Sequence, residues 1–137
     1  AVVAAVQDLG LPSVSAGVIG GGAGLISTFV RDCNRRLADT DLCVPNASVD
    51  DILSATIVAR VAMILPYKTS WHHALATLAQ PTTVLDSSTL IKETADVICD
   101  VVDARTQNEA KGTPRRLRRV AVGTVYSATE LYVTQIK

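Results

Sequence analysis

Five basic residues gather within nine positions near the C-terminal end of the chain, and they are the strongest chemical signal in the sequence. This arginine cluster consists of Lys111, Arg115, Arg116, Arg118 and Arg119. Guanidinium groups bind phosphate and carboxylate oxygens through paired hydrogen bonds. At the start of a helix, positive charges also oppose the helix dipole. The cluster therefore predicts a compensating anion, which we expect to be an acidic partner surface or nucleic-acid phosphate.

Two further charged groups bear on that choice. Arg31, Arg35 and Arg36 lie at the end of an expected helix, where positive charge interacts favourably with the dipole. The acidic stripe consists of Glu93, Asp96, Asp100 and Asp103, at spacings of three, four and three. These spacings place its carboxylates on one helix face, either solvated or facing a basic surface. The sequence leaves open whether the arginine cluster meets this stripe, nucleic acid or solvent.

Glycines at a spacing of four indicate a helix-packing surface. Gly17 and Gly21 form one pair, and Gly20 and Gly24 form a second. Each glycine costs a helix about 1 kcal/mol relative to alanine, so a close contact with another helix should compensate. We expect these glycines to serve helix packing or self-association. The run does not fit a dinucleotide fingerprint, because Leu25 occupies the third glycine position, and we expect no cofactor.

No residues form a recognisable catalytic or metal-binding motif. His72 and His73 are adjacent, so on a helix they point in different directions and do not share a metal. We therefore predict that the protein is not an enzyme and holds no metal. Cys33, Cys43 and Cys99 are expected to be reduced, buried thiols. A Cys33–Cys43 bridge is the alternative for an extracellular protein.

Composition limits the classes of partner. The net charge is zero, so no overall positive field attracts nucleic acid, and any such site depends on local clustering. Aromatic residues make up only 4% of the chain, and the apolar residues are mostly Ala, Val, Leu and Ile. The segment Leu11–Val30 is uncharged but contains Pro12 and five glycines. We expect it to pack as a helix and expect no membrane span.

The spacing of apolar residues and breakers predicts one all-α domain over residues 1–137, a bundle of four to five helices. Expected elements are an opening segment Ala1–Leu9 and helices over Ser15–Ala38, Ser48–Leu65, Thr69–Ala79 and Asp86–Ala110. The helix at 48–65 begins with Ser48 as a cap and is apolar on all sides, which is typical of a buried central helix. Segment 113–137 is rich in Val, Thr and Tyr; we predict a helix, with a β-hairpin as the alternative.

These features lead to two hypotheses about function. The first is a structural, self-associating helical subunit, such as a viral or phage coat-like protein whose arginine cluster contacts nucleic acid or an acidic neighbour. This hypothesis predicts a homo-oligomer. The alternative is a monomeric helical binding protein, secreted if the cysteine bridge forms, with an apolar ligand cavity under the glycine-rich helix. The sequence indicates neither a compartment nor a specific partner.

Overall fold

The computed structural model describes residues 2–18, 20–42, 47–106 and 114–136, and all regular secondary structure in these ranges is helical. Two short helices open the chain, α1 (Val2–Asp8) and α2 (Ser15–Val18). The bundle consists of α3 (Gly21–Asp39), α4 (Val49–Ala62), α5 (Lys68–Leu78), α6 (Val84–Thr106) and α7 (Arg115–Gln135), with a 3-10 turn η1 (Leu65–Tyr67) before α5. The predicted all-α bundle is confirmed.

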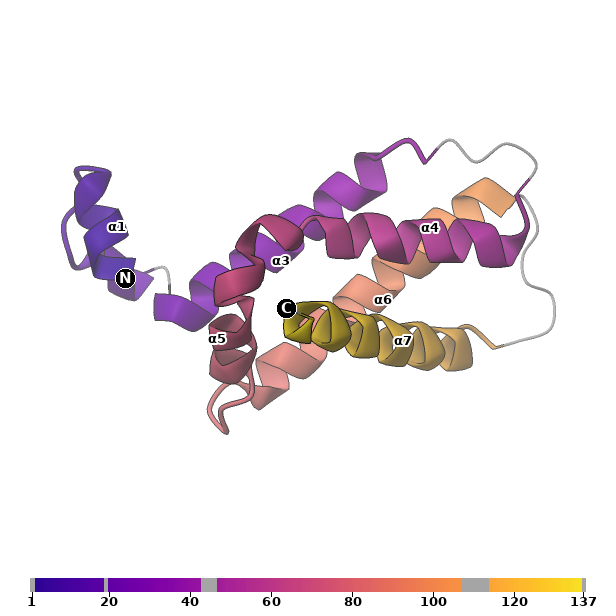
Figure 1. The fold of residues 1–137 in the computed structure, drawn as a ribbon. Helices are drawn as coiled ribbons and strands as arrows, with labels where there is room; N and C mark the ends of the chain where they lie inside the picture. The colour runs from indigo at the N-terminus through magenta and orange to yellow at the C-terminus, as the bar shows by residue number, and fades with distance from the viewer. Residues whose placement is uncertain (1, 19, 43–46, 107–113, 137) are drawn as a thin grey trace.

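The longest described helix, α6, lies at the centre of the bundle (Figure 1) and contacts α3, α4, α5 and α7. Its apolar residues recur at helical spacing, and Leu90, Ile98 and Cys99 are buried. The opening helix α1 packs on α2 and stands apart from the bundle at the left of Figure 1. The buried core is therefore formed by α3 to α7 around α6.

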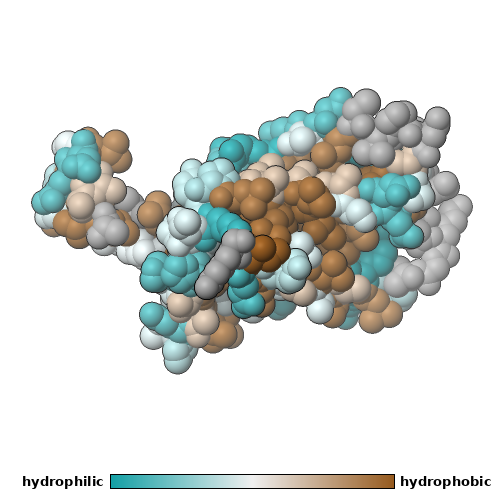
Figure 2. Space-filling view, viewed as in Figure 1, coloured by the Kyte–Doolittle hydropathy of each residue, from teal (hydrophilic) through white to brown (hydrophobic). Residues whose placement is uncertain are grey.

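The helix expected at 48–65 is present as α4, with the predicted capping interaction at its start. The Ser48 hydroxyl accepts a hydrogen bond from the Asp51 backbone N–H at 3.2 Å, and the Asp51 carboxylate accepts one from the Ser48 N–H at 3.1 Å. The helix is buried along one face only, because Val58 on the other face is 65% exposed. Figure 2 shows apolar side chains reaching the surface near the middle of this face of the molecule. The apolar residues on all sides of α4 are therefore not all buried, as the exposed Val58 shows.

The single helix predicted over Ser15–Ala38 is wrong, because the chain changes direction at its glycines. Gly20 and Gly21 adopt left-handed backbone angles, with φ of 75° and 63°, and α2 and α3 lie on either side of this break. A Cβ atom added at Gly17 or Gly21 would meet nothing within 4 Å in the described structure. The glycines at positions 20 and 21 therefore serve a turn.

Gly123, in the middle of α7, lies against another helix. A Cβ atom at this position would lie 3.5 Å from Cγ2 of Ile91 and 3.6 Å from Cβ of Ala95, both on α6. Both distances are ordinary van der Waals contacts. The space between α7 and α6 at this position therefore suffices for one methyl group, so their packing does not require a glycine here.

The C-terminal segment is helical, so the β-hairpin alternative is wrong. Val122, Tyr126 and Glu130 follow one another at intervals of four residues, and all three are buried. This periodicity places one face of α7 against the core, and tertiary packing overrides the strand propensity of the Val- and Thr-rich sequence. Within the described ranges, no helix is long and apolar enough to cross a membrane.

Glycine substitutions test the two backbone roles. Gly123→Ala should raise the free energy of unfolding by about 0.5–1 kcal/mol, because alanine favours a helix and its methyl group fits the space. Gly20→Ala should lower it by about 1 kcal/mol, because its φ of 75° is unfavourable for a residue with a Cβ atom. Urea unfolding followed by circular dichroism measures both changes, and the same sign for both would contradict the assignment.

Candidate functional site

An apolar cavity of about 420 Å³ opens between α5, α6 and α7, and it is the strongest candidate for a functional site. Leu75 and Leu78 of α5 face Leu90 of α6 and Leu131 of α7 across it, and α3 contributes Val30. The predicted alternative of an apolar cavity agrees with this arrangement. The expected position under the glycine-rich stretch does not, because Val30 is the part of α3 that reaches the cavity wall.

One carboxylate, that of Glu130, interrupts the apolar wall. It belongs to α7 and is only 9% exposed. Its Oε1 atom accepts a hydrogen bond from Nε1 of Trp71 at 3.0 Å and a second from the hydroxyl of Tyr126 at 3.2 Å. Trp71 comes from α5, and Tyr126 lies one turn before Glu130 on α7. The two donors therefore fix the carboxylate on the wall of the cavity.

A buried guanidinium, that of Arg60, continues the polar chain into the core. Arg60 of α4 is 0% exposed, and its Nε donates a hydrogen bond to Oδ1 of Asn34 at 2.9 Å. The amide nitrogen of Asn34 in turn donates to the Thr94 hydroxyl at 3.1 Å. The guanidinium carbon lies 5.5 Å from the centre of the Tyr126 ring, a cation–π distance. Its two terminal nitrogens have no hydrogen-bond partner among the described residues.

The ionisation of these groups follows from their burial. Burial raises the pKa of Glu130, while the Trp71 N–H, the charge of Arg60 and the Tyr126 hydroxyl act in the opposite direction. Burial and the neighbouring carboxylate also raise the pKa of Tyr126, so its hydroxyl stays protonated and can donate. A carboxylate with a raised pKa costs stability above that pKa, and the cost shrinks as the pH falls toward the unfolded value.

Only one feature of the sequence pointed to this polar chain. Arg60 is the single charge after Asp51 in an otherwise apolar helix, a pattern that marks a charge for burial. Glu130 and Tyr126 lie in the Val- and Thr-rich segment that predicted either a helix or a hairpin. No local pattern connects them to Asn34 or Trp71, because the hydrogen bonds between different helices in this polar chain span 26 to 60 residues of sequence.

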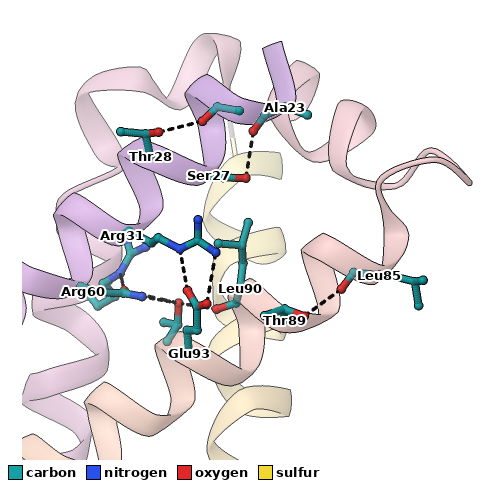
Figure 3. Close-up of polar contacts among 12 residues, drawn as sticks. Ala23, Ser27, Thr28, Arg31, Arg60, Leu85, Thr89, Leu90 and Glu93 are labelled. Carbon is teal, nitrogen blue, oxygen red and sulfur yellow. Dashed lines mark hydrogen bonds and ion pairs between the residues drawn. The ribbon is translucent and has the colours of Figure 1, made fainter. Parts of the chain in front are cut away.

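The structure places most of the predicted basic residues beside carboxylates of the same chain. Arg115 pairs with Asp100, Arg118 with Asp103, Arg119 with Asp96 and Arg31 with Glu93. Figure 3 shows Arg31 reaching from α3 to Glu93 on α6, with Nε to Oε2 at 3.0 Å. Arg35 and Arg36 both pair with Asp32 on their own helix. The acidic stripe thus faces basic residues on α7 and α3.

Other predicted site residues are not part of these contacts. Arg116 is exposed and makes no ion pair with the described chain, and Lys111 lies outside the described residues. Cys33 and Cys99 are buried thiols. Cys43 lies outside the described residues, so a bridge to it stays a prediction. Among the residues that the structure describes, no three His, Cys, Asp or Glu side chains are grouped to hold a metal.

Comparison with known proteins finds relatives that share one name. It is 32% identical, over 144 aligned residues, to a protein of Drosophila melanogaster named ubiquinone biosynthesis protein COQ9, mitochondrial; the match covers 100% of this chain and 43% of the relative. The Homo sapiens protein of the same name is 28% identical over 139 residues, which cover 94% and 42% of the two chains. This chain therefore spans less than half the length of these relatives. No family model matches it.

These relatives overturn the first functional hypothesis. A viral or phage coat-like, self-assembling subunit that binds RNA is wrong, because the similar proteins carry the name of a biosynthetic protein. The prediction from the arginine cluster failed because closely spaced basic residues in a sequence do not reveal which carboxylates lie beside them in the fold. In the folded chain, Arg115, Arg118 and Arg119 face carboxylates of α6, which neutralise much of that charge.

A double-mutant cycle on Arg118 and Asp103 tests the contact between α6 and α7. The two groups share two hydrogen bonds, at 2.7 and 3.1 Å, and are partly buried. We expect a coupling energy of about 1 kcal/mol in urea unfolding. The pKa of Asp103 is lowered, mainly by its hydrogen bond to Arg118, so this stabilisation should be lost as the pH falls through the lowered pKa. Arg116→Ala is the control, and a loss equal to that of Arg118→Ala would contradict the pairing.

A second cycle tests the buried charges. Arg60→Met should lower the free energy of unfolding by about 3–5 kcal/mol, because it leaves the Glu130 carboxylate without its nearest buried positive charge. Adding Glu130→Gln should recover part of this loss, since the uncompensated charge is then absent. Above the raised pKa of Glu130 the recovery should be greatest, and it should shrink at lower pH. Strictly additive effects of the two substitutions would show that the charges do not interact.

Proposed function

We propose that this chain is a non-catalytic, lipid-binding part of a protein of ubiquinone biosynthesis. The observation that carries the proposal is the cavity between α5, α6 and α7, whose wall is apolar apart from a few fixed polar groups. Such a site binds the hydrophobic portion of a small molecule by removing it from water. The name of the relatives supplies the process in which a lipid-like molecule would be handled.

The chemistry of the cavity wall favours binding over catalysis. Its lining contains neither histidine nor cysteine, the side chains that most often act as base or nucleophile. The Ser87 hydroxyl donates to the backbone oxygen of Val84, and the Thr94 hydroxyl donates to that of Leu90. Glu130 is held by two donors through one oxygen. These hydroxyl donors are therefore already engaged within the protein, and Glu130 is fixed in place, which supports a binding role over a catalytic one.

A fluorescent probe tests the cavity directly. Trp71 is the only tryptophan in the chain and lines the cavity, so a bound fluorophore should accept energy from it. We expect the uncharged apolar dye N-phenyl-1-naphthylamine to bind saturably and quench Trp71. Ala76→Phe, which adds a large side chain to the cavity wall, should weaken binding about tenfold or more, equivalent to about 1.4 kcal/mol.

Ala121→Phe provides the matched control, because Ala121 is exposed on α7 and does not line the cavity. Its affinity for the dye should equal that of the unaltered chain. Equal binding by the Ala76→Phe variant would place the dye elsewhere on the surface. Absence of saturable binding by the folded chain would overturn the lipid-binding proposal.

The biosynthetic role calls for a cellular test. The matching segment of the human relative can be replaced by this chain, and the chimera expressed in cells that lack the relative. We expect the chimera to restore ubiquinone content, and the same chimera with Ala76→Phe to restore less. Full restoration of ubiquinone content by both chimeras would show that the cavity is not needed for the role of this segment in the cell.

A further inference from the structure

The cavity contains an unused hydrogen-bond acceptor. Both donors that hold Glu130 reach the same oxygen, Oε1, from Trp71 and Tyr126. Oε2 accepts no hydrogen bond from the described residues. Glu130 is 91% removed from solvent yet lines the cavity, because its exposed fraction is 9%. A carboxylate oxygen in an apolar environment is costly unless it accepts a hydrogen bond, and a bound ligand can supply one.

The charges around Glu130 define which ligand head group can supply that bond. A carboxylate or phosphate head group would place a second negative charge against Glu130 in a poorly solvated site. A cationic head group would be attracted to the carboxylate, but it would have to lose its own hydration in a largely apolar cavity. An uncharged donor avoids both the repulsion of an anion and the desolvation of a second charge. A hydroxyl is the uncharged donor whose oxygen reaches a carboxylate most closely.

The rest of the cavity wall favours a ligand that also has an apolar portion. Leu75, Leu78, Ile91 and Leu131 leave room for an apolar portion, while Ser127 is the neighbouring hydroxyl on α7. Among the charged side chains, only the Glu130 carboxylate lines this largely hydrophobic wall as the structure describes it, an arrangement that fixes the orientation of an amphiphilic molecule. Because Trp71 and Tyr126 already hold the Glu130 carboxylate in place, the side chain loses little conformational entropy when a ligand binds.

From this geometry we propose that Glu130 selects amphiphiles whose polar end is an uncharged hydroxyl group, an alcohol or a phenol, which donates to its free oxygen Oε2. This specificity rests on the proposed lipid-binding function and adds the chemical class of the ligand to it. A site that is built to receive a hydroxyl rejects a matched compound without one more strongly than it rejects a small change in apolar size.

Three matched compounds test the specificity by displacement of N-phenyl-1-naphthylamine at neutral pH. They are 4-nonylphenol, its methyl ether 4-nonylanisole, which lacks the donor, and 4-nonylbenzoate, which carries a negative charge. We expect 4-nonylphenol to bind about tenfold more tightly than 4-nonylanisole, as is usual for a hydrogen bond to a charged group. The benzoate should bind more weakly than both.

Glu130→Gln tests whether the carboxylate causes this preference. The amide has nearly the same shape and can still accept from Trp71, but it has lost the charge. We expect its preference for the phenol over the anisole to fall to about threefold or less, since bonds between neutral groups are weaker, and its discrimination against the benzoate to fall as well. Ser127→Ala, which removes the neighbouring hydroxyl of the wall, should keep the full preference.

The possible failures point to different conclusions. If the unaltered chain binds 4-nonylanisole as tightly as 4-nonylphenol, the hydroxyl specificity is wrong while the lipid-binding function stands. The same conclusion follows if Glu130→Gln keeps the full preference. If neither the dye nor any nonyl compound binds to the folded chain, the lipid-binding function itself fails. The comparison of the phenol with the anisole needs only the unaltered chain, so it decides the specificity even if Glu130→Gln does not fold.

Discussion

The bundle is organised around the burial of one positive charge. Arg60 is completely removed from solvent, and an unpaired charge in such a place would cost several kcal/mol. The fold compensates with the Asn34 amide, the face of the Tyr126 ring and the nearby Glu130 carboxylate. Asn34 comes from α3, Arg60 from α4 and the other two from α7. Compensation therefore requires these helices to meet in one arrangement, whereas a purely apolar core would tolerate several.

The same polar chain connects the core to the cavity. The positive charge of Arg60 stabilises the Glu130 carboxylate, which also accepts a hydrogen bond from Trp71. Both Glu130 and Trp71 line the cavity. Groups that determine how the helices pack thus also determine the polarity of the binding surface. A site placed on packed helices is held more rigidly than one on loops, and a ligand meets a carboxylate that is already oriented.

Charges on the outside of the bundle have a different role. The acidic stripe of α6 faces arginines of α7 and α3, and the ion pairs are largely exposed except for Arg118 with Asp103 and Arg119 with Asp96, which are partly buried. Exposed pairs contribute little to stability individually. Opposite charges along two neighbouring helices nevertheless favour one alignment, in which Gly123 of α7 lies opposite Ile91 and Ala95 of α6.

The sequence by itself determined the helical class, the approximate bounds of most helices and the Ser48 cap, because periodicity and capping are local properties. It also contained Arg60 as the only charge after Asp51 in an otherwise apolar helix. Only the tertiary structure decided that the glycines at positions 20 and 21 form a turn, that Arg115, Arg118 and Arg119 face α6, and that Glu130 joins Trp71 and Tyr126 at a cavity. Each of these depends on contacts between residues far apart in the chain, and local spacing contains no information about which helix faces lie opposite one another.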